Sequence, residues 1–152
     1  MTRLAVAIAT TCGLGYAPIA PGTFGSLAGV LLWWLLPATP LAQGLAIVAV
    51  FSVGTWSASI AERHFARTDP GPVVIDEVLG MLVTFFMVPV TSGGAVVAFL
   101  LFRAADIVKP YPANRFERLH GGLGIMADDG MAGVYANVAL RIAVHFSGHY
   151  LG

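Results

Sequence analysis

Charged residues are scarce in this chain, and the few that occur are unevenly distributed. Only 11% of the 152 residues are Asp, Glu, Lys or Arg, whereas ordinary soluble domains have about 25%. No charged residue occurs between Arg3 and Glu62, and a second uncharged run extends from Val78 to Phe102. Together with 57% hydrophobic residues and a mean hydropathy of +0.81, this deficit predicts a membrane protein or an unusually apolar helical bundle.

Cysteine is almost absent as well. The single cysteine, Cys12, excludes an intramolecular disulfide and a metal site built from several cysteines. No Arg follows it at the spacing of a Cys-x5-Arg nucleophile loop, which excludes that class of thiol phosphatase. The 8 basic and 8 acidic residues give a formal net charge of zero, so the sequence predicts no nucleic-acid partner.

The pattern of apolar residues predicts helices and no strands, since no alternation of apolar and polar residues is sustained. We expect a single domain, residues 1–152, with an all-α fold: a compact multi-helix bundle partly embedded in the membrane. One helix should begin at a Ser26 cap and end at Pro37. A second, Leu41 to Ala61, has roughly the 20 apolar residues needed to cross a bilayer. The last should extend from Met131 to Ser147.

The uncharged run from Val78 to Phe102 contains a strong turn sequence, PVTSGG. As one helix the run would be about 37 Å long, because each residue adds 1.5 Å, and the acids that flank it would lie far apart. We therefore expect two short helices, about 78–88 and 95–102, that form a hairpin and return Asp106 to the side of Asp76. Neither is long enough to cross a bilayer.

Acidic residues are grouped at the ends of these apolar segments. Five of the eight carboxylates fall in three groups: Asp76 with Glu77, Asp106, and Asp128 with Asp129. Each group alone has an ordinary structural explanation, because acids favour the first turn of a helix and occur in turns. Together they are costly at the ends of apolar helices unless they pair or bind a metal ion. Oxygen ligands without a Cys or His cluster suit Mg²⁺, which binds carboxylates together with a substrate phosphate.

Features that suit a phosphate accompany the acids. Arg103, Asp106 and Lys109 are spaced by three residues, which places them on one helix face, and both cations suit phosphate oxygens. The stretch GLGYAPIAPGTFGS combines glycines, which let backbone N–H groups approach an anion, with hydroxyl donors near a helix start. We expect this loop to bind the phosphate through four residues: Gly22, Thr23, Gly25 and Ser26.

Four sequence blocks carry a resemblance to a known family: GLGYAPIAPGTFGSLAG, DPGPVVIDEVLG, FRAADIVKP and GGLGIMADDGMAG. In this order and combination they resemble the signatures of the phosphatidylglycerophosphatase A family. The resemblance implies an all-α bundle with a central helix and a Mg²⁺-dependent lipid phosphatase of the bacterial inner (cytoplasmic) membrane. It further implies hydrolysis of phosphatidylglycerophosphate to phosphatidylglycerol and inorganic phosphate, a step of phospholipid biosynthesis. The partner would be the phospholipid substrate in the bilayer.

The expected mechanism combines these residues in one site. One or two Mg²⁺ ions would be held by Asp76, Glu77, Asp106, Asp128 and Asp129, with one of these acids serving alternatively as general base. Lys109 and Arg103 would neutralise charge that develops as water attacks phosphorus in line. A covalent aspartyl-phosphate route is an alternative that the sequence leaves open.

A small membrane transport or channel subunit with buried carboxylates for ion binding is the competing function. It explains acids within apolar segments, but it requires no phosphate-type loop, and the chain is short for alternating access.

His120, beside Gly121, is a further candidate as a proton shuttle. By the positive-inside rule, the active site should face the cytoplasm, because the loops near it carry five basic residues: Arg63, Arg67, Lys109, Arg115 and Arg118.

Overall fold

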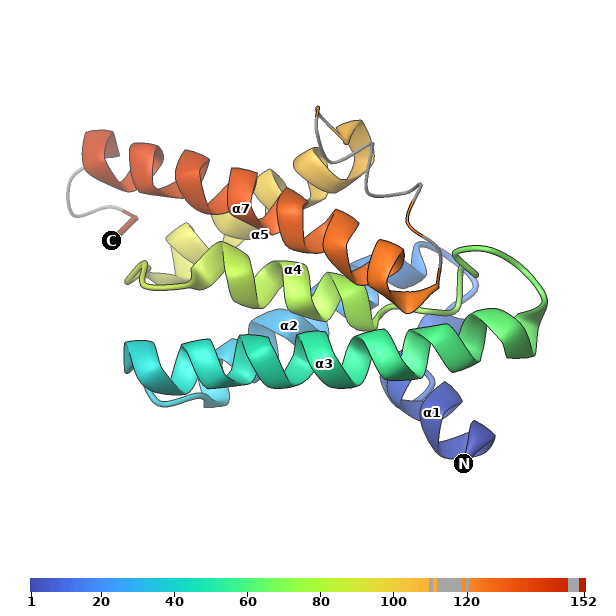
Figure 1. Ribbon diagram of the computed structural model, residues 1–152. Coiled ribbons are helices and arrows are strands. Elements are labelled where there is room, and N and C mark those ends of the chain that lie inside the picture. Colours follow the sequence, from blue (N-terminus) through green and yellow to red (C-terminus); the bar gives the residue numbers. More distant parts are fainter. Residues whose placement is uncertain (110, 112–118, 120, 148–150) are drawn as a thin grey trace.

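A computed structural model describes residues 1–109, 111, 119, 121–147 and 151–152. All regular elements within these residues are helices: α1 (Thr2–Ala9), the short 3-10 helix η1 (Leu14–Tyr16), α2 (Pro21–Leu35), α3 (Pro40–Phe65), α4 (Ile75–Phe85), α5 (Ser92–Val108) and α7 (Gly122–Ser147). The predicted all-α bundle is therefore confirmed (Figure 1).

Helix α4 is the central helix of the bundle. It packs against α2, α3, α5 and α7, and Figure 1 shows it between α3 and α7 with α2 and α5 behind. Its sequence is apolar nearly all round, which is typical of a helix buried on every side. Met81 and Phe85 of α4 join Phe102 of α5 and Leu140 of α7 in the main hydrophobic core.

Glycines let α4 and α7 approach closely where they meet. A Cβ atom on Gly133 would lie only 2.5 Å from the carbonyl oxygen of Gly80, so a side chain there would force the two helices apart. Each of these glycines follows an acid by four residues, about one helical turn: Asp76 precedes Gly80, and Asp129 precedes Gly133. The close approach therefore places the two carboxylates side by side.

The turn after α4 folds α5 back along the bundle, as predicted. The side chain of Thr91 caps α5, where its Oγ1 accepts a hydrogen bond from the Gly94 amide at 3.2 Å. Helix α5 is longer than expected, because it continues past Phe102 to Val108. Asp106 consequently lies on the last turns of a continuous helix, at the end of the bundle where α4 begins.

The predicted start of α2 was wrong, although its end was correct. The helix begins at Pro21, and Ser26 lies inside it, with its hydroxyl donating to the Gly22 carbonyl at 2.8 Å. Proline suits the first helical position because its φ is already fixed and an N–H there would have no intrahelical partner. The helix ends at Leu35, ahead of Pro37.

The last helix also begins earlier than predicted, at Gly122 rather than Met131. Asp128 and Asp129 therefore lie within a helix and not in the turn before it. The Gly122 amide donates to Ser59 Oγ of α3 at 2.9 Å, which fixes the start of α7 against α3. The glycine-rich block thus provides a close helix contact instead of a loop.

Helix α3 is the helix in the described residues that is long and apolar enough to cross a membrane. Only 22% of its most apolar 18-residue stretch is buried inside the molecule, and the side chains of Leu45 and Val48 are 61% and 62% exposed. Large apolar side chains are also exposed on α2, including Trp34, and on α5, including Val96. These surfaces are compatible with membrane association.

Candidate active site

One cavity gathers most of the charged side chains of the described residues. It has a volume of about 530 Å³ and lies where the N-terminal ends of α2, α4 and α7 meet the C-terminal ends of α3 and α5. Every acid in the described part of the chain lines it: Glu62, Asp69, Asp76, Glu77, Asp106, Asp128 and Asp129. Arg103 and Lys109 line it too. The cavity therefore brings together residues from all four sequence blocks.

Asp76, Glu77 and Asp129 form the tightest group of acids. Each offers a carboxylate oxygen, and these three oxygens lie within 4.8 Å of one another. One oxygen of each acid (Asp76 Oδ1, Glu77 Oε2 and Asp129 Oδ2) is buried and has no hydrogen-bond partner among the described residues. Such buried carboxylates are strongly unfavourable unless a cation lies between them. Because Mg²⁺ prefers anionic oxygen ligands, these residues fit a hard divalent cation.

Burial and mutual repulsion raise the pKa of these acids. Desolvation is the main cause of the raised pKa of Asp76 and of Asp129, and the charge of Glu77 adds to both. Desolvation also raises the pKa of Glu77, although a hydrogen bond with Asp76 and the charge of Arg103 counteract it. A bound cation would reverse these shifts, because it favours the ionised form of each acid.

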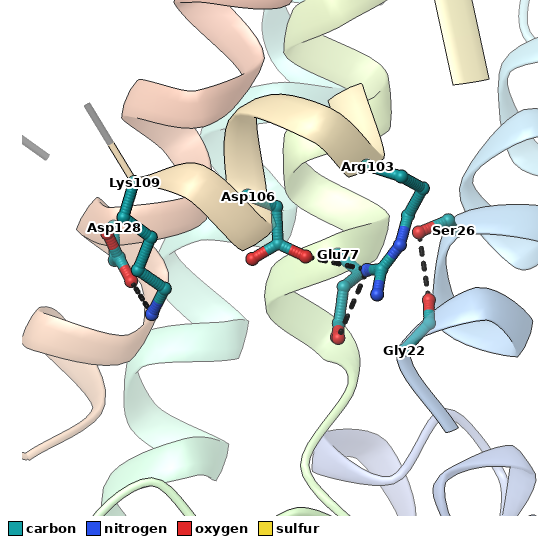
Figure 2. Close-up of polar contacts among 7 residues, drawn as sticks. All are labelled: Gly22, Ser26, Glu77, Arg103, Asp106, Lys109 and Asp128. Atoms are coloured by element: carbon teal, nitrogen blue, oxygen red, sulfur yellow. Dashed lines mark hydrogen bonds and ion pairs between the residues drawn. The ribbon is translucent and has the colours of Figure 1, made fainter. Parts of the chain in front are cut away.

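Both basic residues that line the cavity in the described part of the chain contact an acid (Figure 2). Arg103 Nη1 lies 2.7 Å from Asp106 Oδ2 and 3.8 Å from Glu77 Oε1, which links α5 to α4. Lys109 Nζ donates to Asp128 Oδ2 of α7. Lys109 lies just beyond the end of α5 in the left-handed conformation, with a φ of 46°, so it does not continue the helix face of Arg103 and Asp106.

The four residues expected to bind phosphate lie in the first turns of helix α2 and not in a loop. Ser26 is fully buried, and a Cβ on Gly25 would lie 2.7 Å from the Val74 carbonyl oxygen, so both residues serve the packing of α2 on the segment that enters α4. Thr23 is half-buried and lies outside the lining of the cavity. Of the four residues expected to bind phosphate, Gly22 alone lines the cavity.

Gly22 lies where a side chain would disturb the acids and the arginine. A Cβ there would collide with the Glu77 carboxylate and would lie 3.0 Å from Arg103 Nη1. The first turn of a helix leaves backbone N–H groups without intrahelical partners and attracts anions. Three helices, α2, α4 and α7, direct their N-terminal ends toward this cavity, so their dipoles favour an anionic ligand.

Two acids of the cavity were not predicted: Glu62 near the end of α3 and Asp69 in the segment before α4. Asp69 has a φ of 46°, and its charge contributes to the raised pKa of Asp76. Asp69 could have been identified from the sequence, because it begins the block DPGPVVIDEVLG. Glu62 gave no such signal, because it resembles an ordinary solvent-exposed acid near the end of a helix. His120, Arg115 and Arg118 lie outside the described residues.

Comparison with known proteins shows the family. The profile of the family described as "Phosphatidylglycerophosphatase A" matches residues 7–144. The chain is 36% identical over 146 residues to Phosphatidylglycerophosphatase A of Escherichia coli K12, covering 94% of this chain and 83% of that relative. It is 34% identical over 140 residues to the Haemophilus influenzae protein of the same name, covering 88% and 84% respectively.

A third relative carries a different name. A Bacteroides thetaiotaomicron protein named "Putative phosphatidylinositol-3-phosphatase" is 38% identical over 149 residues, which cover 92% of this chain and 93% of that relative. No solved structure shows significant similarity to the chain. The profile match and the extent of these identities establish that the chain belongs to the phosphatidylglycerophosphatase A family.

Proposed function

We propose that the protein hydrolyses phosphatidylglycerophosphate to phosphatidylglycerol and inorganic phosphate in this cavity, with Mg²⁺ as its cofactor. The observation that carries the proposal is the group formed by Asp76, Glu77 and Asp129, each of which has one buried oxygen without a hydrogen-bond donor among the described residues. Two cations and three helix N-termini surround this group, which suits a phosphate next to a metal ion. Membership of the family supports the choice of substrate.

The residues that would hold Mg²⁺ are Asp76, Glu77 and Asp129, with Asp106 and Asp128 completing the set at the wall of the cavity. When bound, Mg²⁺ supplies Lewis-acid polarisation of the phosphate and lowers the pKa of water. Asp106 and Asp128 also hold Arg103 and Lys109 in place through their ion pairs. Both cations are thereby positioned beside the proposed phosphate site.

The chain's own groups provide the rest of the chemistry. Arg103 and Lys109 neutralise the charge on the phosphate oxygens, and the backbone at Gly22 lets the phosphate approach the start of α2. One carboxylate of the cavity accepts the proton of the attacking water. A phosphorus–oxygen bond to that water forms, the bond to the glycerol oxygen breaks, and the departing oxygen takes up a proton to give phosphatidylglycerol.

We place the protein in the bacterial inner membrane with this cavity at the cytoplasmic face. The cavity lies at the same end of α3 as Arg63 and Arg67, two of the basic residues that the positive-inside rule assigns to the cytoplasm. The apolar surfaces of α2, α3 and α5 would then face lipid. The substrate would reach the cavity from the bilayer.

Phosphate release from phosphatidylglycerophosphate in detergent micelles tests the proposal. We expect release that requires Mg²⁺, stops with a chelator and resumes when Mg²⁺ is restored. A transport or channel subunit would release no phosphate, and that result would contradict the proposal. Release that continues unchanged in the chelator would contradict the metal part alone.

The relative from Bacteroides favours a second substrate, phosphatidylinositol 3-phosphate. Both lipids present a phosphomonoester attached to an alcohol carrier, so the charged cavity suits either headgroup. We expect a higher kcat/KM for phosphatidylglycerophosphate when both lipids are assayed in identical micelles, because two relatives carry the corresponding name. The reverse order would assign the chain to the inositol lipid.

A further inference from the structure

A second cavity lies between α2 and α5 and differs entirely from the first in character. It has a volume of about 330 Å³, and its lining is apolar except for Ser92. Leu27, Leu31 and Trp34 line it from α2, and Ala95, Val96 and Phe99 line it from α5. Several of these side chains are open to the outside, with Leu31 57% exposed and Val96 60% exposed. The cavity is therefore an open apolar groove.

The groove leads directly to the charged cavity. On α5 its residues recur at helical spacing through Val96 and Phe99, and the same stripe continues to Arg103 and Asp106. On α2 the stripe that includes Leu27 leads back to Ala20, which lines the charged cavity. The apolar groove and the charged cavity therefore follow one another along the same two helices.

The helices beside the groove are fixed by the core of the protein. Trp33 of α2 stacks on Phe85 of α4, with ring centroids 4.2 Å apart. Val30 and Phe99 on the inner side of the groove pack against the main hydrophobic core. The groove is thus a formed feature between two anchored helices, and its shape does not depend on a flexible loop.

We propose that this groove binds an acyl chain of the lipid whose phosphate occupies the charged cavity. The proposal rests on the proposed function, because it needs a lipid phosphate as the ligand. A phosphate beside Arg103 and Gly22 places the lipid at the mouth of the groove, and an acyl chain is the apolar part of that same molecule. From Gly22 to Trp34 the helix rises about 18 Å, a path that only an extended chain would follow.

A substitution that fills the groove tests this binding. Val96→Trp adds a large side chain to an exposed position, so the core remains intact. We expect kcat/KM for a substrate with palmitoyl chains to fall about tenfold, the loss expected when roughly two buried methylene groups lose their contacts. For a substrate with hexanoyl chains, too short to reach far along the groove, we expect almost no change.

Val48→Trp is the matched control. Val48 is 62% exposed, against 60% for Val96, and it lies on α3 away from the groove. We expect its kcat/KM to stay at the wild-type value for both substrates. Equal losses for long and short chains in Val96→Trp, or no loss for either, would overturn the proposal, and so would an equal loss in Val48→Trp.

Cross-linking separates the groove from the catalytic proposal, because it needs no turnover. A phosphatidic acid with a diazirine near the middle of one palmitoyl chain is irradiated with the protein in detergent. We expect adducts on groove residues such as Leu31 and Val96, displaced by excess unlabelled phosphatidic acid but not by phosphatidylcholine. Adducts spread evenly over exposed apolar residues, including Val48, would overturn the groove even if hydrolysis is observed. Adducts in the groove without hydrolysis would support binding of an acyl chain there and would contradict the proposed reaction.

Discussion

Asp129 is the single residue at which charge and packing can be separated most cleanly. It is 4% exposed, and its pKa is raised by burial and by the neighbouring acids. Asp129→Asn retains the size of the side chain and removes the charge. We expect turnover to fall on the order of a hundredfold or more, the usual cost of removing a metal ligand or general base. Phosphate release at saturating Mg²⁺ measures this effect.

The melting temperature of the same variant should move differently. A raised pKa in the folded protein means that the ionised carboxylate destabilises the fold above the pKa of the unfolded chain. At neutral pH in a chelator, Asp129→Asn should therefore melt no lower than the wild type, and added Mg²⁺ should stabilise it less. Glu117→Gln, outside every motif, should leave activity unchanged. Normal activity in Asp129→Asn would remove Asp129 from the site.

Gly22 tests whether the start of α2 must remain without a side chain. In Gly22→Ala the new Cβ would push against the Glu77 carboxylate and the Arg103 guanidinium. We expect kcat/KM to fall about tenfold. The melting temperature should hardly change, because alanine favours a helix by about 1 kcal/mol over glycine and this gain offsets the cost of the new contacts. Gly44→Ala, whose Cβ would have Phe86 at 3.9 Å as its nearest neighbour, should keep full activity. Full activity in Gly22→Ala would contradict a close approach of phosphate there.

At the scale of elements, the contact between α4 and α7 holds the acids together. In Gly133→Ala the new Cβ would lie 2.5 Å from the Gly80 carbonyl oxygen, so the helices must separate. We expect unfolding free energy to fall by about 1–3 kcal/mol, as for other overpacked contacts, and activity to fall with it. Gly130→Ala on the same helix, where Leu79 at 3.6 Å leaves normal contact distance, should not lower stability. Equal melting temperatures for the two variants would refute this role of Gly133.

The elements themselves were largely readable from the sequence. The turn signal PVTSGG correctly predicted the hairpin of α4 and α5, because proline cannot continue a helix and Thr91 caps the start of the next one. Helix starts were predicted less well. Ser26 and the block around Asp128 suggested caps and turns, but glycine in α2 and α7 is tolerated where a neighbouring backbone approaches closely, as Gly25 and Gly133 show. The helix propensity of a residue contains no information about which segments of the chain pack against it.

At the scale of the whole molecule, polarity is divided between its parts. The described acids all line one cavity, whereas exposed apolar side chains of α2, α3 and α5, such as Trp34, Val48 and Val96, lie outside its lining. We expect the protein to sediment with membranes and to require detergent for extraction, because contiguous exposed apolar surface is not tolerated by a protein in water. A protein that remains monodisperse in buffer and absent from the membrane fraction would refute the membrane assignment and leave the fold unaffected.

Composition and spacing by themselves determined the class of fold, the apolar helices and the grouping of five of the acids that line the cavity. They did so because burial of apolar surface and the cost of buried charge depend on residue type alone. Only the tertiary structure decided which acids share one group and that Glu62 and Asp69 line the cavity. It also decided that Asp106 and Asp128 form ion pairs with Arg103 and Lys109. These outcomes depend on how closely the helices pack, and glycines distant in sequence set that distance.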